Sequence, residues 1–189
     1  MLITASDKKK LLETARLTIS NALSGFEQQD TSDVEHLAFE RGVFVTLTEK
    51  GMLRGCIGNI MPELPLYRAV IENAFNAAFK DPRFSLVVLE ELDDILIEIS
   101  ILSLPLVIDF SSIDELKNKI TPFEDGVILT FGKYRKSTFL PQVWEELPDF
   151  DEFMGHLSMK AGLDYNAWKT MNPKIEIYKA DHFSEKDLL

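Results

Sequence analysis

The sequence predicts an α+β protein with a mostly antiparallel sheet and flanking helices. Segments with alternating apolar residues occur in pairs joined by short turns, as at residues 43–48 and 52–57. Helical patterns, with apolar residues three and four positions apart, separate these segments. Strands joined by tight turns pair in antiparallel fashion, so most of the sheet is expected to be antiparallel.

The first element is predicted to be a helix with one apolar face. Ser6 or Asp7 can cap its start, and Gly25 can end it. Its apolar face is formed by Leu11, Ala15, Ile19 and Ala22. A polar stretch, Glu27–His36, follows and is interpreted as a loop.

Two strands, a helix and a third strand are predicted next. Val43, Val45 and Leu47 alternate with polar or aromatic residues, and the turn 49–51 leads into the second strand, 52–57. A helix then begins near Pro62 and Pro65 and ends at Asp81, because a proline at 82 disfavours helical backbone before it. Its apolar face is formed by Leu66, Val70, Ala74, Ala77 and Ala78. Residues 95–102 form the third strand, with isoleucine at every second position.

The remaining elements are shorter. Ser112 and Glu115 have the spacing of a capping box, which predicts a helix through Ile120. Residues 127–131 and 137–140 are expected to form a hairpin. The last expected elements are a helical segment after Pro141 that holds Gln142 and Trp144, a helix from the Asp149 and Glu152 cap to Ala161, a short helix at 165–169 and a strand at 175–178.

Length and charge limit the possible functions. The 189 residues are expected to form a single domain, 1–189, because no long linker or internal repeat is present. The net charge of −11 repels phosphate backbones, so we expect no nucleic-acid binding. The densest basic stretch, Lys133–Lys136, is interpreted as a solvated turn.

Compartment is predicted from what the sequence lacks. Cys56 is the single cysteine, so an internal disulfide is impossible and a reducing compartment fits. The N-terminal segment has no apolar signal-peptide core. The most apolar stretch, Ile99–Ile108, is too short to span a bilayer. We therefore expect a cytoplasmic protein without a membrane partner.

The most informative segment for chemistry surrounds Cys56. Strand alternation places Leu53 and Ile57 on the core face, and Arg54 and Cys56 together on the other. A neighbouring guanidinium favours the thiolate form of a cysteine, so Arg54 and Cys56 are candidate catalytic residues. The glycines at 55 and 58 would let a backbone or a ligand approach the thiol closely. The alternative is a small structural cysteine, which is what most free cysteines are.

This segment also carries a resemblance to a known family. Leu53–Gly58 reads LRGCIG, the signature of the AMMECR domain family, and the sequence resembles that family over residues 6–182. Further matching segments follow in order at 42–47, 81–84, 97–103, 125–129, 138–144 and 160–163. The sequence departs from the pattern at three places. Ser158 stands where many relatives have a second cysteine, Ser85-Leu86-Val87 replaces a proline-containing run, and Leu104 intervenes between Ser103 and Pro105.

The resemblance implies a fold of two unequal lobes with a cleft between them, where the signature residues gather. No activity is established for the family as a class. Some members resemble the A component of the AmmeMemoRadiSam system, which is encoded with a Memo-like protein and a radical SAM enzyme. These two proteins are therefore possible partners. One cysteine cannot supply the usual ligands of an iron–sulfur cluster, so no cofactor is expected.

Three more residues are candidate ligand-binding residues. Arg83 can hold an anion in the cleft or pair with an acid of the protein itself. Thr138 and Gln142 flank a possible helix start, where free N–H groups attract anions, although Thr138 can equally serve as an ordinary cap. We predict that these three residues lie near Arg54 and Cys56. No metal site is expected, because Glu152 and His156 supply only two ligands on a solvated face.

Two functions remain open from the sequence. The first is an enzyme, or an enzyme component, that acts on a small anionic substrate with Cys56 and Arg54 in its site. The second is a non-catalytic protein-binding or adaptor module with a structural cysteine. No histidine or aspartate can be assigned to Cys56 as a base, which weakens the case for acyl transfer.

Overall fold

The structure is a computed structural model that describes residues 3–26 and 30–188. The chain divides into two compact units. Unit 1 consists of Met1–Leu102 with Asp181–Leu189, and unit 2 consists of Ser103–Ala180. Each unit has a hydrophobic core of its own.

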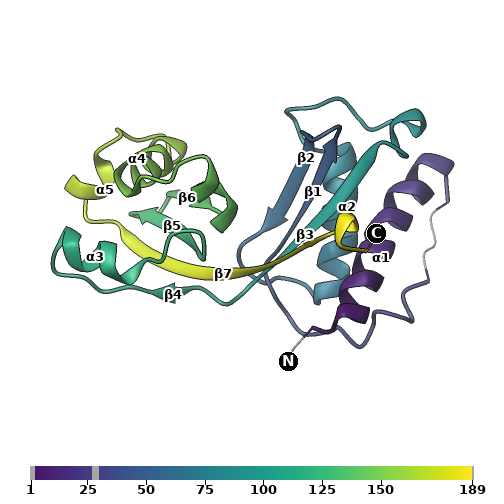
Figure 1. The fold of residues 1–189 in the computed structure, drawn as a ribbon, viewed down its shortest axis with the longest axis horizontal. Coiled ribbons are helices and arrows are strands. Elements are labelled where there is room, and N and C mark those ends of the chain that lie inside the picture. The colour runs from purple at the N-terminus through teal and green to yellow at the C-terminus, as the bar shows by residue number, and fades with distance from the viewer. Residues whose placement is uncertain (1–2, 27–29, 189) are drawn as a thin grey trace. The chain divides into compact units, whose positions relative to one another are not determined.

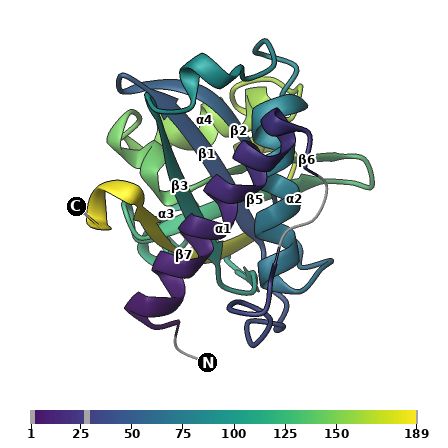
Figure 2. The ribbon, with the colours of Figure 1, turned by 90° about the vertical axis from the view of Figure 1, so that its right-hand side faces the viewer.

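Unit 1 is a helix-covered antiparallel sheet. It contains α1 (Ala5–Ser24), β1 (Val43–Glu49), β2 (Met52–Asn59), α2 (Leu66–Phe79), the short 3-10 helix η1 (Leu89–Glu91) and β3 (Ile95–Leu102). The strands lie in the order β2–β1–β3, so β2 is an edge strand. Helices α1 and α2 pack beside each other on one face of these strands (Figure 2). The alternating residues Val43, Val45 and Leu47 are buried there.

Helix boundaries in unit 1 follow local capping. Helix α1 starts earlier than predicted, because Thr4 is its N-cap and exchanges hydrogen bonds with Asp7 in a capping box. Its end at Gly25 is confirmed by a left-handed φ of 75°. Helix α2 ends at Phe79, two residues before Asp81. Of the predicted loop Glu27–His36, residues 27–29 lie outside the described residues, and the rest forms turns.

Unit 2 packs short helices onto a second set of antiparallel strands. It contains β4 (Leu106–Val107), α3 (Ile113–Lys119), β5 (Asp125–Phe131), β6 (Arg135–Phe139), the 3-10 helix η2 (Pro141–Glu145), α4 (Phe150–Lys160) and α5 (Ala167–Thr170). Strand β7 (Lys174–Ser184) runs from unit 2 into unit 1 and is followed by η3 (Glu185–Leu188) (Figure 1). In unit 2, β5 lies between β6 and β7, and β4 pairs with β7. In the core, Trp144 stacks on Phe153 with 3.6 Å between ring centroids.

The prediction of an α+β fold with an antiparallel sheet is confirmed. Strand β4 was not predicted, because two exposed residues carry no alternation. The last strand is longer than 175–178, and the segment after Pro141 is a 3-10 helix. The side chain of Ser112 caps α3 by accepting the N–H of Glu115. The Glu115 carboxylate accepts the N–H of Ser111, where a capping box would have that of Ser112. The predicted cleft between two lobes, and the assignment of 1–189 as a single domain, stay predictions.

Candidate functional site

The segment Leu53–Gly58 forms the middle of the edge strand β2. Cys56 lies opposite Thr46 and Gly55 opposite Leu47, but Leu53 lies opposite Thr48, so the register shifts by one residue. Arg54 is the extra residue of this bulge. The prediction that Leu53 lies in the core is wrong, because the bulge breaks the alternation and leaves it 44% exposed. Ile57, beyond the bulge, packs against the core as predicted.

Arg54 is a buried, fully engaged side chain, only 9% exposed. Its Nε and Nη2 donate to the two carboxylate oxygens of Glu91 at 2.8 and 2.9 Å. Its Nη1 and Nη2 also donate to the backbone carbonyls of Ser85 and Leu86 at 2.9 and 3.3 Å. Glu91 in turn accepts from the N–H of Val88. Arg54 therefore fastens the segment 85–91 to the start of β2.

This pairing shifts the pKa values of both side chains. The hydrogen bond from Arg54 holds the pKa of the Glu91 carboxyl below its ordinary value, although partial burial opposes the shift. The pKa of Arg54 is raised by the same partner. Both groups are thus charged at neutral pH and neutralise each other.

Asp81 and Arg83 close the outer edge of β2 beside Cys56. The buried Asp81 carboxylate accepts the Cys56 N–H at 2.9 Å, while Arg83 Nη2 donates to the Cys56 carbonyl at 3.2 Å. Asp81 also accepts from Nε and Nη2 of Arg83 at 2.9 and 2.6 Å. Two side chains thus take the hydrogen bonds that an added strand would make, which protects the edge from pairing.

The acidity of Asp81 follows from these contacts. Its hydrogen bond from Arg83 holds the pKa of the carboxyl well below the ordinary range, and the backbone N–H groups of Cys56 and Arg83 add to this effect. Burial acts in the opposite direction. The carboxylate is therefore charged throughout the neutral range.

Cys56 has a different neighbouring guanidinium from the one predicted. The four hydrogen bonds of Arg54 go to Glu91 and to two carbonyls, whereas the guanidinium close to the thiol is that of Arg83. The pKa of Arg83 is raised first by Asp81 and, to a smaller extent, by the side chain of Cys56. Arg83 therefore occupies the position beside the thiol that the sequence suggested for Arg54, because the bulge turns Arg54 away.

The thiol itself is partly exposed. Thr46 Oγ1 donates to Cys56 Sγ at 3.3 Å across the β1–β2 pair. The glycines beside it serve packing within unit 1. A Cβ on Gly55 would lie 2.2 Å from the carbonyl oxygen of Ala77 in α2, and one on Gly58 would overlap the ring of Phe44. The predicted close approach of a backbone is thus present at Gly55.

The other predicted ligand residues lie in unit 2. Thr138 Oγ1 donates to the carbonyl of Val127 at 2.9 Å and lies 2.8 Å from the hydroxyl of Tyr178. Its hydroxyl is therefore used inside the β5–β6 hairpin. Gln142 lies in the short 3-10 helix η2, which is not a regular α-helix start. Arg54, Cys56 and Arg83 lie near one another in unit 1, and the predicted proximity of Thr138 and Gln142 to them stays a prediction.

Comparison with known proteins identifies the family. The AMMECR1 family matches residues 12–183. The chain belongs to this family. A protein of Methanosarcina acetivorans is 38% identical, over 98% of this chain and 95% of that protein. A protein of Methanocaldococcus jannaschii is 40% identical, over 97% of this chain and 92% of its own length.

A solved structure agrees with this assignment. The crystal structure of an uncharacterized protein from Pyrococcus horikoshii is similar, with a TM-score of 0.88 and 35% identity. The match covers 97% of this chain and 93% of that one. The AMMECR1 fold is therefore shared across proteins with about two thirds of their residues different.

Among the described residues, no three histidine, cysteine, aspartate or glutamate side chains gather as a metal site would require. Within the same residues, no helix combines the length and the apolar character needed to cross a bilayer.

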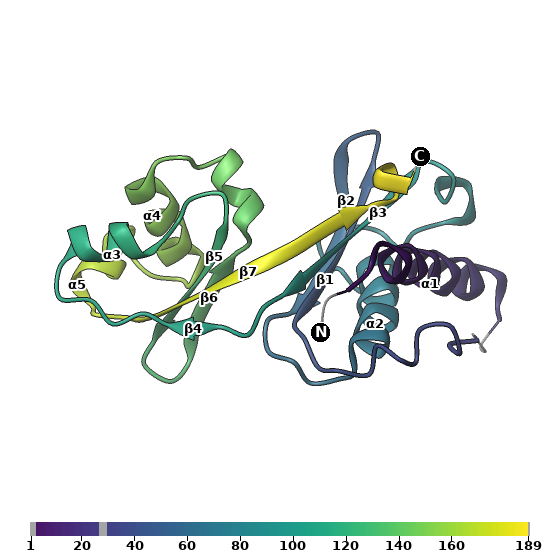
Figure 3. The same ribbon diagram turned by 60° about the horizontal axis from the view of Figure 1, so that its bottom comes forward.

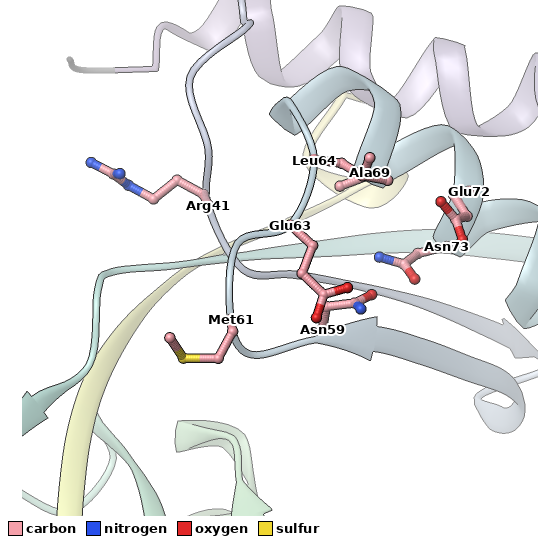
Figure 4. A pocket seen from close by; sticks show the side chains of 8 residues that line it. All are labelled: Arg41, Asn59, Met61, Glu63, Leu64, Ala69, Glu72 and Asn73. Carbon is pink, nitrogen blue, oxygen red and sulfur yellow. The ribbon is translucent and has the colours of Figure 1, made fainter.

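A small polar pocket lies elsewhere in unit 1. The side chains of Asn59, Glu63 and Asn73 converge there, while Arg41 points away (Figure 4). The pocket has a volume of about 40 Å³, which is enough for a water molecule but not for a substrate. None of the five predicted site residues lines it.

Three residues at the AMMECR1 signature were missed as contributors. Glu91 lies 37 positions from Arg54, so nothing in the sequence links them. Thr46 lies on the predicted strand 43–48. Counting residue pairs from the turn at 49–51 places Thr46 opposite Cys56 only when the bulge in β2 is included. Asp81 lies within the matching segment 81–84, and the pairing of Arg83 with an acid was one of the alternatives, but Asp81 was not predicted to be that acid.

Proposed function

We propose that this protein is a non-catalytic protein-binding module, and that its contact surface lies beside Arg54 in unit 1. The surface consists of five apolar side chains, here called the β2 surface: Met52, Leu53, Leu86, Val88 and Leu89. Each is between 44% and 70% exposed. Contiguous exposed apolar side chains are typical of sites where proteins meet.

The two halves of the β2 surface are held together by Arg54. Met52 and Leu53 precede Arg54 on the strand, and its guanidinium binds the carbonyls of Ser85 and Leu86. Glu91, paired with Arg54, accepts the N–H of Val88. This arrangement is the observation that carries the proposal, because a largely buried ion pair fixes the backbone that carries the exposed apolar side chains. Immobilised apolar side chains lose less entropy when a partner binds.

The charges around the β2 surface define the chemistry of the partner. Glu90 and Asp93 are exposed and form no ion pair with another described residue. Asp94, also exposed, is paired with Lys50. A matching partner would present an apolar segment flanked by lysine or arginine, since complementary rims favour association. The family resemblance suggests a Memo-like protein or a radical SAM protein as that partner.

A second candidate function is thiol chemistry at Cys56, on a small anionic substrate. It is supported by the partial exposure of Cys56 and by the nearby Arg83 guanidinium. Under this alternative Arg83, and not Arg54, would be the guanidinium beside the thiol and would attract the anion, with Thr138 and Gln142 as further ligand-binding candidates. We rank it second because, among the residues that the structure describes, the hydrogen-bond partner of the thiol is the hydroxyl of Thr46, which is not a base.

The binding proposal is tested by calorimetric titration with the purified Memo-like protein and the purified radical SAM protein of the same organism. One of them should bind the wild type, and Leu86→Asp and Leu89→Asp should each weaken that binding at least tenfold. Leu104→Asp is the matched control. It makes the same change at an exposed leucine of unit 2, outside the β2 surface, and this variant should bind normally. Binding that is indifferent to all three substitutions, or absent with both proteins, would exclude the proposal.

A further inference from the structure

Unit 2 carries a group of cations without acidic partners. Lys133, Arg135 and Lys136 lie at the turn of the β5–β6 hairpin, and all three are exposed. None of them forms an ion pair with any residue that the structure describes. Other cations of unit 2 are paired, for example Lys117 and Lys169, which share Asp151. In a chain with a net charge of −11, this turn is a local exception.

The strand register divides these cations between two faces. Arg135 lies opposite Phe131, whose side chain is buried, and Lys136 lies opposite Thr130. Because neighbouring side chains on a strand point to opposite faces, Arg135 and Lys136 point in opposite directions. Arg135 Nη1 donates to the carbonyl of Gly162 at 2.8 Å, which fixes it toward the segment after α4.

A groove lies on the Arg135 face. It has a volume of about 430 Å³ and is lined by Lys133, Tyr134, Arg135, Leu163 and Met171, together with Phe131 and Gly132. Tyr134 is 94% exposed, and Met171 is exposed as well. Figure 3 shows that the turn between β5 and β6 extends free of the helices of unit 2. An exposed tyrosine beside apolar side chains is a frequent anchor of protein interfaces.

We propose that this groove binds an acidic peptide segment of a partner protein, one that carries an apolar side chain between carboxylates. Two unpaired cations match two carboxylates, and Leu163, Met171 and Tyr134 supply the apolar contact. Asp164, which follows the lining residue Leu163, accepts the N–H of Asn166. A nucleic acid fits less well, because two cations neutralise few phosphates and the rest of the chain repels them. This proposal is independent of the β2 surface.

The test uses the full chain and a labelled synthetic peptide in which glutamates flank leucine, followed by fluorescence anisotropy. A peptide with lysine in place of glutamate is the control probe. We expect a dissociation constant below about 100 µM for the acidic peptide at low salt, with affinity falling as salt rises. Lys133→Glu and Arg135→Glu should each weaken binding roughly tenfold, and Tyr134→Ala should weaken it severalfold.

Lys136→Glu is the matched control, because it makes the same charge change on the other face of the same hairpin. It should weaken binding less than about threefold. Equal losses of affinity for Lys133→Glu and Lys136→Glu would overturn the groove as the site, since binding would then depend only on the net charge of the hairpin. Absence of binding, or preferential binding of a single-stranded oligonucleotide, would overturn the proposal that the groove binds an acidic peptide. Leu89→Asp should leave peptide binding unchanged, which separates this test from that of the proposed function.

Discussion

The β2 edge in unit 1 and the β5–β6 turn in unit 2 use arginine in opposite ways. Arg54 is buried and makes four hydrogen bonds, two of them to Glu91. Arg135 is exposed and makes one, to a backbone carbonyl. A buried, satisfied guanidinium shapes the surface around it, whereas an exposed one is available to a partner. The residues of a signature motif can therefore be structural even when they are charged.

The largest effect that would test this contrast is expected at Asp81. Asp81→Ala removes the acceptor for the Cys56 N–H, the Arg83 N–H and the Arg83 guanidinium. The free energy of unfolding should fall by about 3 kcal/mol, because three partly buried donor groups lose their acceptor. Urea denaturation measures it. Asp81→Asn, which keeps one acceptor oxygen, should lose less, and equal losses for both variants would refute the edge-closing role.

A smaller loss is expected at Arg54. Arg54→Met should lower the free energy of unfolding by about 2 kcal/mol, because it leaves Glu91 without its partner. The Glu91 side chain is 24% exposed, so water offsets part of the loss. Arg135→Met is the matched substitution in unit 2 and should change stability by less than about 0.5 kcal/mol. Similar values for the two variants would remove the contrast between the regions.

Acid should weaken the β2 edge. The pKa of Asp81 is depressed in the folded state. The contribution of Asp81 to stability is therefore complete above the ordinary carboxyl pKa range, and it is lost as the pH falls through that range toward the pKa of the folded state. The free energy of unfolding should drop by roughly 1–2 kcal/mol between about pH 4 and pH 2. Asp7, whose pKa is lowered to about 2 chiefly by its hydrogen bond from Thr4, adds to this drop.

Asp81→Asn separates the contribution of Asp81 from that of Asp7. The variant has no titrating group at this position, so its stability should vary less steeply with pH over the same range. Denaturation curves collected at several pH values measure both slopes. Parallel slopes in the variant and the wild type would show that Asp81 does not titrate as described.

The smallest effect concerns the two arginines near Cys56. Arg83→Met should slow alkylation of Cys56 at neutral pH by a fewfold, because Arg83 is the guanidinium near the thiol. Arg54→Met, assayed under conditions where it is folded, should leave the rate nearly unchanged. Alkylation with iodoacetamide followed by mass spectrometry gives both rates. A slower reaction in Arg54→Met alone would restore Arg54 as the activating residue.

The sequence predicted the elements of the fold better than the geometry of the site. Alternation at Val43, Val45 and Leu47 identified β1, because one face of that strand is buried without interruption. The same rule failed at Leu53, because a bulge adds one residue to β2 and no residue type marks it. Gly25 and Asp149 marked helix ends correctly, since capping depends on local backbone geometry.

The site depends on contacts between distant residues, which local patterns do not contain. The pair Arg54 and Glu91 joins a strand to a loop after the following helix. The pair Asp81 and Arg83 is local, but the sequence predicted only that Arg83 could pair with some acid, and the bonds of the pair to the backbone of Cys56 require knowledge that β2 is an edge strand. Sequence thus located the important segments, and their roles depended on the bulge and the strand order.

Hydrogen–deuterium exchange of this chain, alone and mixed with the partner proposed here, a Memo-like or a radical SAM protein, tests the central claim most directly. If the β2 surface is the contact, exchange should slow at residues 52–54 and 85–90 when the complex forms, while residues 104–107 in unit 2 stay unchanged. Slower exchange confined to other segments, with 85–90 exchanging as in the free chain, would contradict the claim that Arg54 and Glu91 hold a protein-binding surface.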